Sequence, residues 1–158
     1  MKYRSDFVTN SSSSSFIIAF KSISERESML NAFSLSYPSF AHIVIEDILR
    51  NKVSRQEVLK QIEADLESEA YWKYYWGNRK YWDWNRESPA IDPYKDPEIQ
   101  KAVKEYVKEG LEKAIQVLPK RGYYSIVEYG DDDVVWYGEL EHDIMPYLDF
   151  VYRTISHH

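Results

Sequence analysis

The sequence predicts an α+β protein, in which helices pack on one face of a small, mainly antiparallel sheet. Three observations lead to this expectation. They are an apolar run of strand length near the N-terminus, several segments with apolar residues at helical spacing, and a late pair of β-rich segments around an acidic turn. A length of 158 residues is typical of one domain, so we expect residues 1–158 to form a single α+β domain.

The first predicted element is a strand at residues 16–20, which read FIIAF. Both of its faces are apolar, which is typical of a strand that is covered on both sides or lies centrally in a sheet. We expect this N-terminal strand to pair with the late hairpin. That pairing would connect the start of the chain to its C-terminal third.

Capping boxes predict the start of two helices. Ser24 with Glu27, and Ser54 with Glu57, have the spacing at which serine caps the first turn and glutamate reaches back to the cap. The first box predicts a helix that ends before the next proline. Apolar residues at helical spacing follow the second box and predict a helix to about Trp76.

Two further helices are predicted between and after these boxes. Residues 40–51 fit both a strand and a helix, and the spacing of their apolar residues favours the helix. Asp96-Pro97 predicts the start of another helix, because aspartate is a good N-cap and proline is tolerated at the first helical position. Apolar residues keep helical spacing from there until Pro119.

The last third of the chain predicts the hairpin. Residues 123–130 and 134–140 are rich in β-branched and aromatic side chains, and three aspartates separate them. Residues 144–155 are apolar enough to dock on the core as a short helix or an extended segment. The expected order is therefore strand, helices and hairpin.

Composition excludes several classes of site and partner. The chain has no cysteine, which excludes disulfides, cysteine-ligated zinc and a thiol nucleophile. A net charge of −6 argues against binding to duplex nucleic acid and to anionic membranes. No apolar run reaches the roughly 20 residues that span a bilayer. We expect a cytoplasmic protein without a cofactor.

A run of five serines directly precedes the first strand. Serine favours turns and caps, so one interpretation is a polar entry loop whose last serines begin the strand. The alternatives are an anion-binding segment, a modification site and a serine nucleophile. The candidate ligand-binding residues are Thr9, Asn10, Ser11, Ser12 and Ser13.

Residues 7–16, FVTNSSSSSF, resemble the N-terminal signature F-V-[ST]-N-S-S-S-S-S-F of a group of uncharacterised small bacterial and phage-associated proteins. Residues 138–146, GELEHDIMP, are similar to a segment near the end of some members of this group. The resemblance supplies no activity and no catalytic residues. It implies that the serine run belongs to the native protein and has a defined role, and it suggests an association with phages.

An aromatic cluster at residues 71–86, which read YWKYYWGNRKYWDWNR, combines eight aromatic with four basic side chains. Such a mixture serves three purposes in proteins: packing in the core, a protein interface such as a homodimer, and stacking on bases or sugars. The candidate interaction surface consists of Trp72, Trp76, Trp82 and Trp84.

Late acidic residues are the remaining candidates for chemistry. We expect the three aspartates of the hairpin turn to be solvated, and the alternative is a cation site at Asp131 and Asp133. Glu139 and Glu141 would share one face of a strand with Asp143, where carboxylates could bind a hard cation or do acid–base work. His142 would partner one of these glutamates only if the strand bends.

Two functional hypotheses follow from these features. The first is a non-catalytic binding or interaction module that contacts a protein partner or a second copy of itself. The alternative is an enzyme that acts on a phosphate-containing or other small substrate. In the enzyme, the serine segment would bind the substrate and the carboxylates of residues 139–143 would do the chemistry.

Overall fold

The computed structural model describes residues 13–76, 92–130 and 137–157. The chain divides into two compact units, one of residues 1–58 with 118–158 and the other of residues 59–117. The α+β class is confirmed, because helices accompany a four-stranded antiparallel sheet. The expectation of a single domain stays a prediction.

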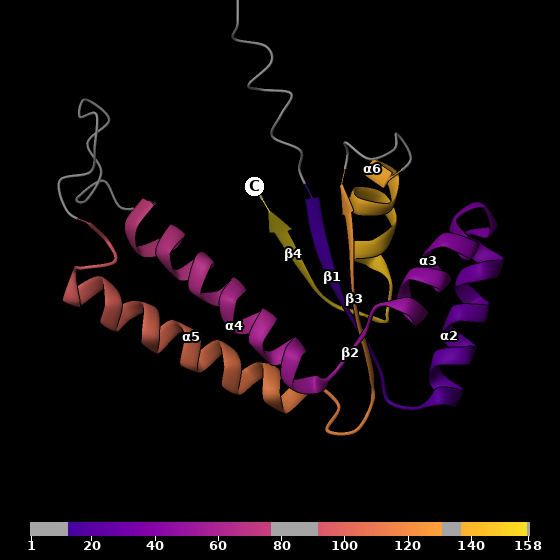
Figure 1. The fold of residues 1–158 in the computed structure, drawn as a ribbon, viewed down its shortest axis with the longest axis horizontal. Coiled ribbons are helices and arrows are strands. Elements are labelled where there is room, and N and C mark those ends of the chain that lie inside the picture. Colours follow the sequence, from indigo (N-terminus) through magenta and orange to yellow (C-terminus); the bar gives the residue numbers. More distant parts are fainter. Residues whose placement is uncertain (1–12, 77–91, 131–136, 158) are drawn as a thin grey trace, which may run out of the picture. The chain divides into compact units, whose positions relative to one another are not determined.

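The first unit contains the sheet and most of the short elements (Figure 1). In chain order these are β1 (Ser13–Phe20), α2 (Ile23–Ser36), α3 (Pro38–Arg50), β2 (Lys52–Val53), the start of α4 (Arg55–Tyr71), β3 (Tyr123–Gly130), α6 (Tyr137–Glu139), the π-helical η2 (Leu140–Ile144), the 3₁₀ turn η3 (Met145–Tyr147) and β4 (Val151–His157).

The sheet has the strand order β2-β3-β1-β4, and every described pair is antiparallel. β1 therefore lies between two long strands, as Figure 1 shows, which confirms the expected pairing of this apolar strand with the late part of the chain. Ser14 of β1 lies opposite Tyr129 of β3 and Ser156 of β4. The register to β4 shifts between Ile17 and Ile18.

Helices cover the face of the sheet on which Phe16, Ile18 and Phe20 of β1 lie. Phe16, Ile18 and Phe20 point into a core that also contains buried side chains from α2, α3, β3 and the η2–η3 segment. The other members of this core are Leu30, Phe33, Val44, Ile48, Val127, Tyr129, Leu140, Ile144, Met145 and Phe150. The expectation of helices on one face of the sheet agrees with this core.

The structure confirms one of the two predicted capping boxes and corrects the other. Ser54 accepts the backbone N–H of Glu57 at 3.1 Å and its own N–H bonds to the carboxylate of Glu57 at 2.6 Å, so the second capping box is confirmed. The first box is wrong by two residues. Ser22, and not Ser24, caps α2 and accepts the N–H of Glu25 at 3.0 Å. The helix start moves because Ser22-x-x-Glu25 repeats the same spacing.

The predicted second strand of the hairpin is wrong from residue 137 onward. Tyr137–Glu139 is α-helical and Leu140–Ile144 is π-helical. Leu140 and Glu141 are buried, as are Ile144 and Met145, and this spacing forms one stripe on a helix, whereas adjacent residues of a strand point to opposite faces. The strand that completes the sheet comes instead from β4, in the segment expected to dock on the core.

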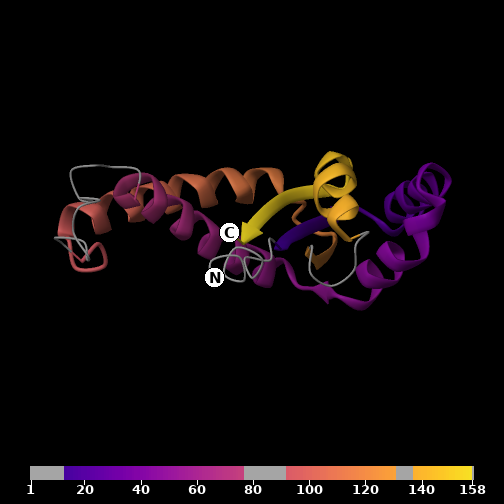
Figure 2. The ribbon, with the colours of Figure 1, turned by 90° about the horizontal axis from the view of Figure 1, so that it is seen from above.

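The second unit contains the rest of α4, the π-helical η1 (Trp72–Trp76) and α5 (Pro97–Val117). Within this unit α4 and α5 lie side by side (Figure 1 and Figure 2). Asp96 caps α5 by accepting the backbone N–H of Glu98 at 2.9 Å, which confirms the predicted start. Gly110 of α5 allows α4 to come close at this point, because a Cβ on residue 110 would lie 2.7 Å from the side chain of Leu66.

Candidate functional site

The last serines of the run begin β1. Ser14 is buried, with 4% of its surface exposed, and its hydroxyl donates a hydrogen bond of 2.7 Å to Oε1 of Glu141. Ser13 is half-buried at the first position of β1, opposite Gly130. The other candidate ligand-binding residues lie outside the described residues, and they are Thr9, Asn10, Ser11 and Ser12.

Of the carboxylates at positions 139, 141 and 143, which the structure describes, that of Glu141 is buried. It is 2% exposed, and its second oxygen, Oε2, has no hydrogen-bond partner among the described residues. The imidazole Nε2 of the half-exposed His142 lies 3.6 Å from that oxygen. Glu139 and Asp143 are exposed, so the three carboxylates do not share a face. The expectation of a common face depended on a strand, and a helical segment spreads alternate residues around its axis.

The described part of the aromatic cluster divides between core and surface. Tyr75 is buried in the second unit with Ala70, Ile99 and Val103. Trp72 is 69% exposed, so one candidate of the interaction surface is accessible in this unit. Trp76 ends η1, and the positions of Trp82 and Trp84 lie outside the described residues, as do those of Asp131 and Asp133.

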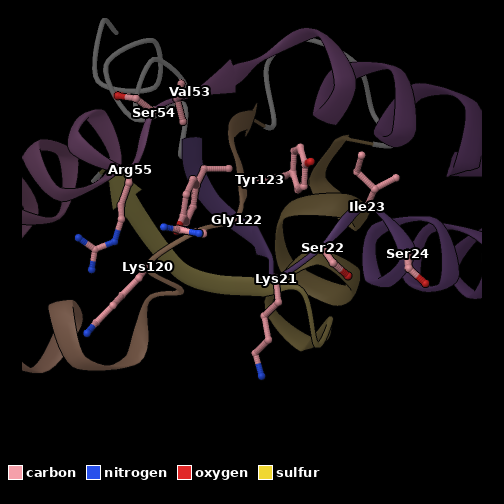
Figure 3. Close-up of a pocket in the computed structure, with 12 residues that line it drawn as sticks. Lys21, Ser22, Ile23, Ser24, Val53, Ser54, Arg55, Lys120, Gly122 and Tyr123 are labelled. Atoms are coloured by element: carbon pink, nitrogen blue, oxygen red, sulfur yellow. The ribbon is translucent and has the colours of Figure 1, made fainter.

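A basic cleft in the first unit was not predicted from the sequence (Figure 3). It has a volume of about 800 Å³ and is lined by three segments that are distant in sequence. Four of the lining residues carry a positive charge, and none carries a negative charge. The lining residues are Lys21, Ser22, Ile23, Ser24, Val53, Ser54, Arg55, Lys120, Arg121, Gly122, Tyr123 and Tyr124.

Two helix starts meet at this cleft. Ser22 is the N-cap of α2 and Ser54 precedes α4, and both line the cleft. The first backbone N–H groups of a helix have no partner within the helix and carry a partial positive charge. Glu25 and Glu57 bond to the residues at these helix starts and offset part of that charge, so the cations provide most of the positive potential.

Hydrogen bonds to one carbonyl fix the wall formed by the loop after α5. Arg55 donates from Nε to the carbonyl of Pro119 at 3.1 Å, and the hydroxyl of Tyr124 donates to the same carbonyl. Gly122 passes close to β1, because a Cβ at this position would lie 2.5 Å from the backbone oxygen of Phe20. These contacts hold Lys120 and Arg121, the two residues between Pro119 and Gly122, at the edge of the cleft.

An aromatic and an aliphatic side chain line the cleft opposite two of its cations. Figure 3 shows Arg55 and Lys120 on one side, and Tyr123 with Ile23 on the other. Tyr123 is 40% exposed and Ile23 is 47% exposed. The guanidinium of Arg26 lies 5.1 Å from the centre of the Tyr123 ring, a cation–π contact that braces the ring. Two of the four cations, Arg55 and Lys120, thus lie across the cleft from Tyr123 and Ile23.

The sequence held only a weak signal for this cleft. Its cations come from positions 21, 55, 120 and 121, and the net charge of −6 hides their grouping. The one local sign is the adjacent pair Lys120-Arg121 directly after a helix-ending proline. Only the sheet, which pairs Phe20 with Tyr123 and Val53 with Tyr124, brings the three segments together.

Within the described ranges, no helix combines the length and the apolar character needed to cross a membrane. In the same ranges, no three His, Asp or Glu side chains are grouped so that they could hold a metal ion. Comparison of the chain with protein-family models, with curated proteins and with solved structures found no match.

Proposed function

We propose that the protein is a non-catalytic binding module whose basic cleft takes a phosphate-bearing ligand. The observation that carries this proposal is the grouping of Lys21, Arg55, Lys120 and Arg121 around one cleft in a chain of net charge −6. Cations are costly to bring together because they repel each other, and an anionic ligand removes that repulsion. The cleft is therefore suited to an anion.

The lining groups match the needs of a phosphate. Arginine can donate two parallel hydrogen bonds to phosphate oxygens, and lysine adds a mobile positive charge. The exposed hydroxyl of Ser24, which lines the same cleft, adds a donor. Cations, hydroxyls and backbone donors bind and orient an anion, whereas acid–base catalysis near neutral pH relies mostly on histidine or carboxylate groups.

The alternative is an enzyme that uses the serine segment and the carboxylates of residues 139–143. One observation supports it, which is the direct contact between Ser14 and Glu141. Both side chains are buried and the serine proton is directed at a carboxylate, an arrangement suited to fastening η2 onto β1. We therefore favour the binding module.

Calorimetric titration with tripolyphosphate tests the proposal. Each hydrogen bond to a charged group contributes about 1.5–3 kcal/mol, so the double variant K120E/R121E should bind at least roughly tenfold more weakly than the unchanged protein. The control K101E/K113E changes the net charge equally at two exposed residues that do not line the cleft, and it should keep the affinity. Equal weakening by both variants, or no binding by the unchanged protein, would count against the cleft.

Location and partners are part of the same proposal. We propose a cytoplasmic location, which is supported by a sequence without cysteine. We also propose that Trp72, which is 69% exposed, contacts a protein partner or a second copy of the chain. Light scattering should then show an assembly in the unchanged protein that the variant W72A loses.

A further inference from the structure

The apolar side of the basic cleft points to a ligand that is more than a bare anion. A phosphate ion needs only charged and polar donors, yet Tyr123 and Ile23 expose apolar surface opposite Arg55 and Lys120 (Figure 3). Exposed apolar groups beside cations favour a ligand with two unlike ends, one anionic and one flat and apolar.

The size of the cleft agrees with such a ligand. Its volume of about 800 Å³ lies within the range of roughly 300–1,000 Å³ that is typical of small-molecule and cofactor sites. An inorganic phosphate would fill only a small part of this space. The four cations exceed what one phosphate group requires, which favours a ligand with several phosphates.

We infer that the cleft binds a nucleoside polyphosphate, with its phosphates at Arg55, Lys120 and Arg121 and its base against the ring of Tyr123. This inference rests on the proposed function and names the ligand class of the same site. Bases stack on tyrosine rings, and Arg26 at 5.1 Å from the ring centre braces Tyr123 for such a contact.

A small polyphosphate suits this protein better than a long nucleic acid strand. Binding a strand takes a positive groove that follows its backbone over several nucleotides. In a chain of net charge −6, the positive charge in the cleft would attract the phosphates near it, and the rest of the surface would repel the remainder of a strand. A nucleoside polyphosphate is short enough to lie within the cleft.

Titrations of the full chain with ATP, tripolyphosphate and adenosine separate the two halves of the ligand. We expect ATP to bind roughly tenfold more tightly than tripolyphosphate, since stacking contributes on that order. The variant Y123V should reduce ATP binding to the level of tripolyphosphate and leave tripolyphosphate unchanged. Y123F keeps the ring and should keep the preference. Y147V, which changes an exposed tyrosine that does not line the cleft, should behave like the unchanged protein.

Each outcome decides a different point. Equal affinities for ATP and tripolyphosphate in the unchanged protein would overturn the nucleotide inference and leave the anion-binding module intact. This comparison needs no variant, so it decides the question even if Y123V does not fold. Absence of binding by both compounds would overturn the proposed function together with the inference. A preference for ATP that survives Y123V would place the base elsewhere and refute the stacking contact.

Discussion

Replacing the buried Ser14 by alanine should lower the free energy of unfolding far more than replacing an exposed serine would. The Ser14 hydroxyl lies 2.7 Å from Oε1 of Glu141, and both side chains are buried. S14A would remove the Ser14 donor from a buried carboxylate whose other oxygen, Oε2, has no hydrogen-bond partner among the described residues. A buried acceptor that loses its donor costs about 1–3 kcal/mol, and more when it is charged.

We therefore expect S14A to lower the free energy of unfolding by about 3 kcal/mol. For a chain of 158 residues, this corresponds to a fall of roughly 6–12 °C in the melting temperature. Urea denaturation followed by tryptophan fluorescence and circular dichroism would measure the change. An unchanged denaturant slope would show that the loss lies in stability and not in compactness.

Two further variants make the test specific. Ser156 lies opposite Ser14 in β4 but is exposed, so S156A should change the free energy of unfolding by less than about 0.5 kcal/mol. The double variant S14A/E141M removes the carboxylate together with its donor and should be more stable than S14A alone. If S14A melts like the unchanged protein, the hydrogen bond to Glu141 does not fasten β1, and this reasoning is refuted.

Three other substitutions have outcomes that the structure fixes. G122A should cost at least about 2 kcal/mol in urea denaturation, because its Cβ would meet the rigid backbone oxygen of Phe20 at 2.5 Å. G110A should stay within about 1 kcal/mol of the unchanged protein, since the side chain of Leu66 can move and alanine favours the helix; a larger loss in G110A than in G122A would contradict both expectations. The pKa of Tyr129 is raised above its ordinary value of 10.0, mainly because the side chain is buried and secondly because the carboxylate of Asp47 lies beside it. The raised pKa leaves stability unaffected below pH 10 and lowers it as the pH rises further, because the unfolded chain then releases this proton more readily. Above pH 10, Y129F should therefore lose stability less steeply, by up to about 1.4 kcal/mol per pH unit, and parallel curves would show that Tyr129 ionises normally.

The parts of the fold that sequence could predict are those with local signals. The helix starts at Ser54 and Asp96 follow from side chains that bond to backbone groups two or three residues away. The second part of β1, residues 16–20, follows from a continuous apolar run. The register of the first cap could not be decided locally, because Ser22 and Ser24 both precede a glutamate at the same spacing.

The parts that sequence could not predict depend on distant contacts. The segment before and at residue 137 is rich in residues that favour strands, yet from there the burial of the adjacent pairs Leu140-Glu141 and Ile144-Met145 fits a helix. The contact of Ser14 with Glu141 joins the serine run to one of the late carboxylates, two features that the sequence shows only separately. The basic cleft needs three segments that the sheet brings together, so no window of sequence contains it.

The central position of β1 also sets a condition on how the protein is made. In the sequence, β1 precedes both long strands that pair with it. Phe20 cannot pair until Tyr123 has been synthesised, and Ser13 cannot pair with β4 until His157 has been synthesised. Until ribosomes have produced those partners, a strand with Phe16, Ile17 and Ile18 has no sheet in which to bury them. Such long-range pairing slows folding and leaves an apolar segment open to aggregation during synthesis. Nascent chains that stop before β4 should thus be the forms that chaperones and proteases capture.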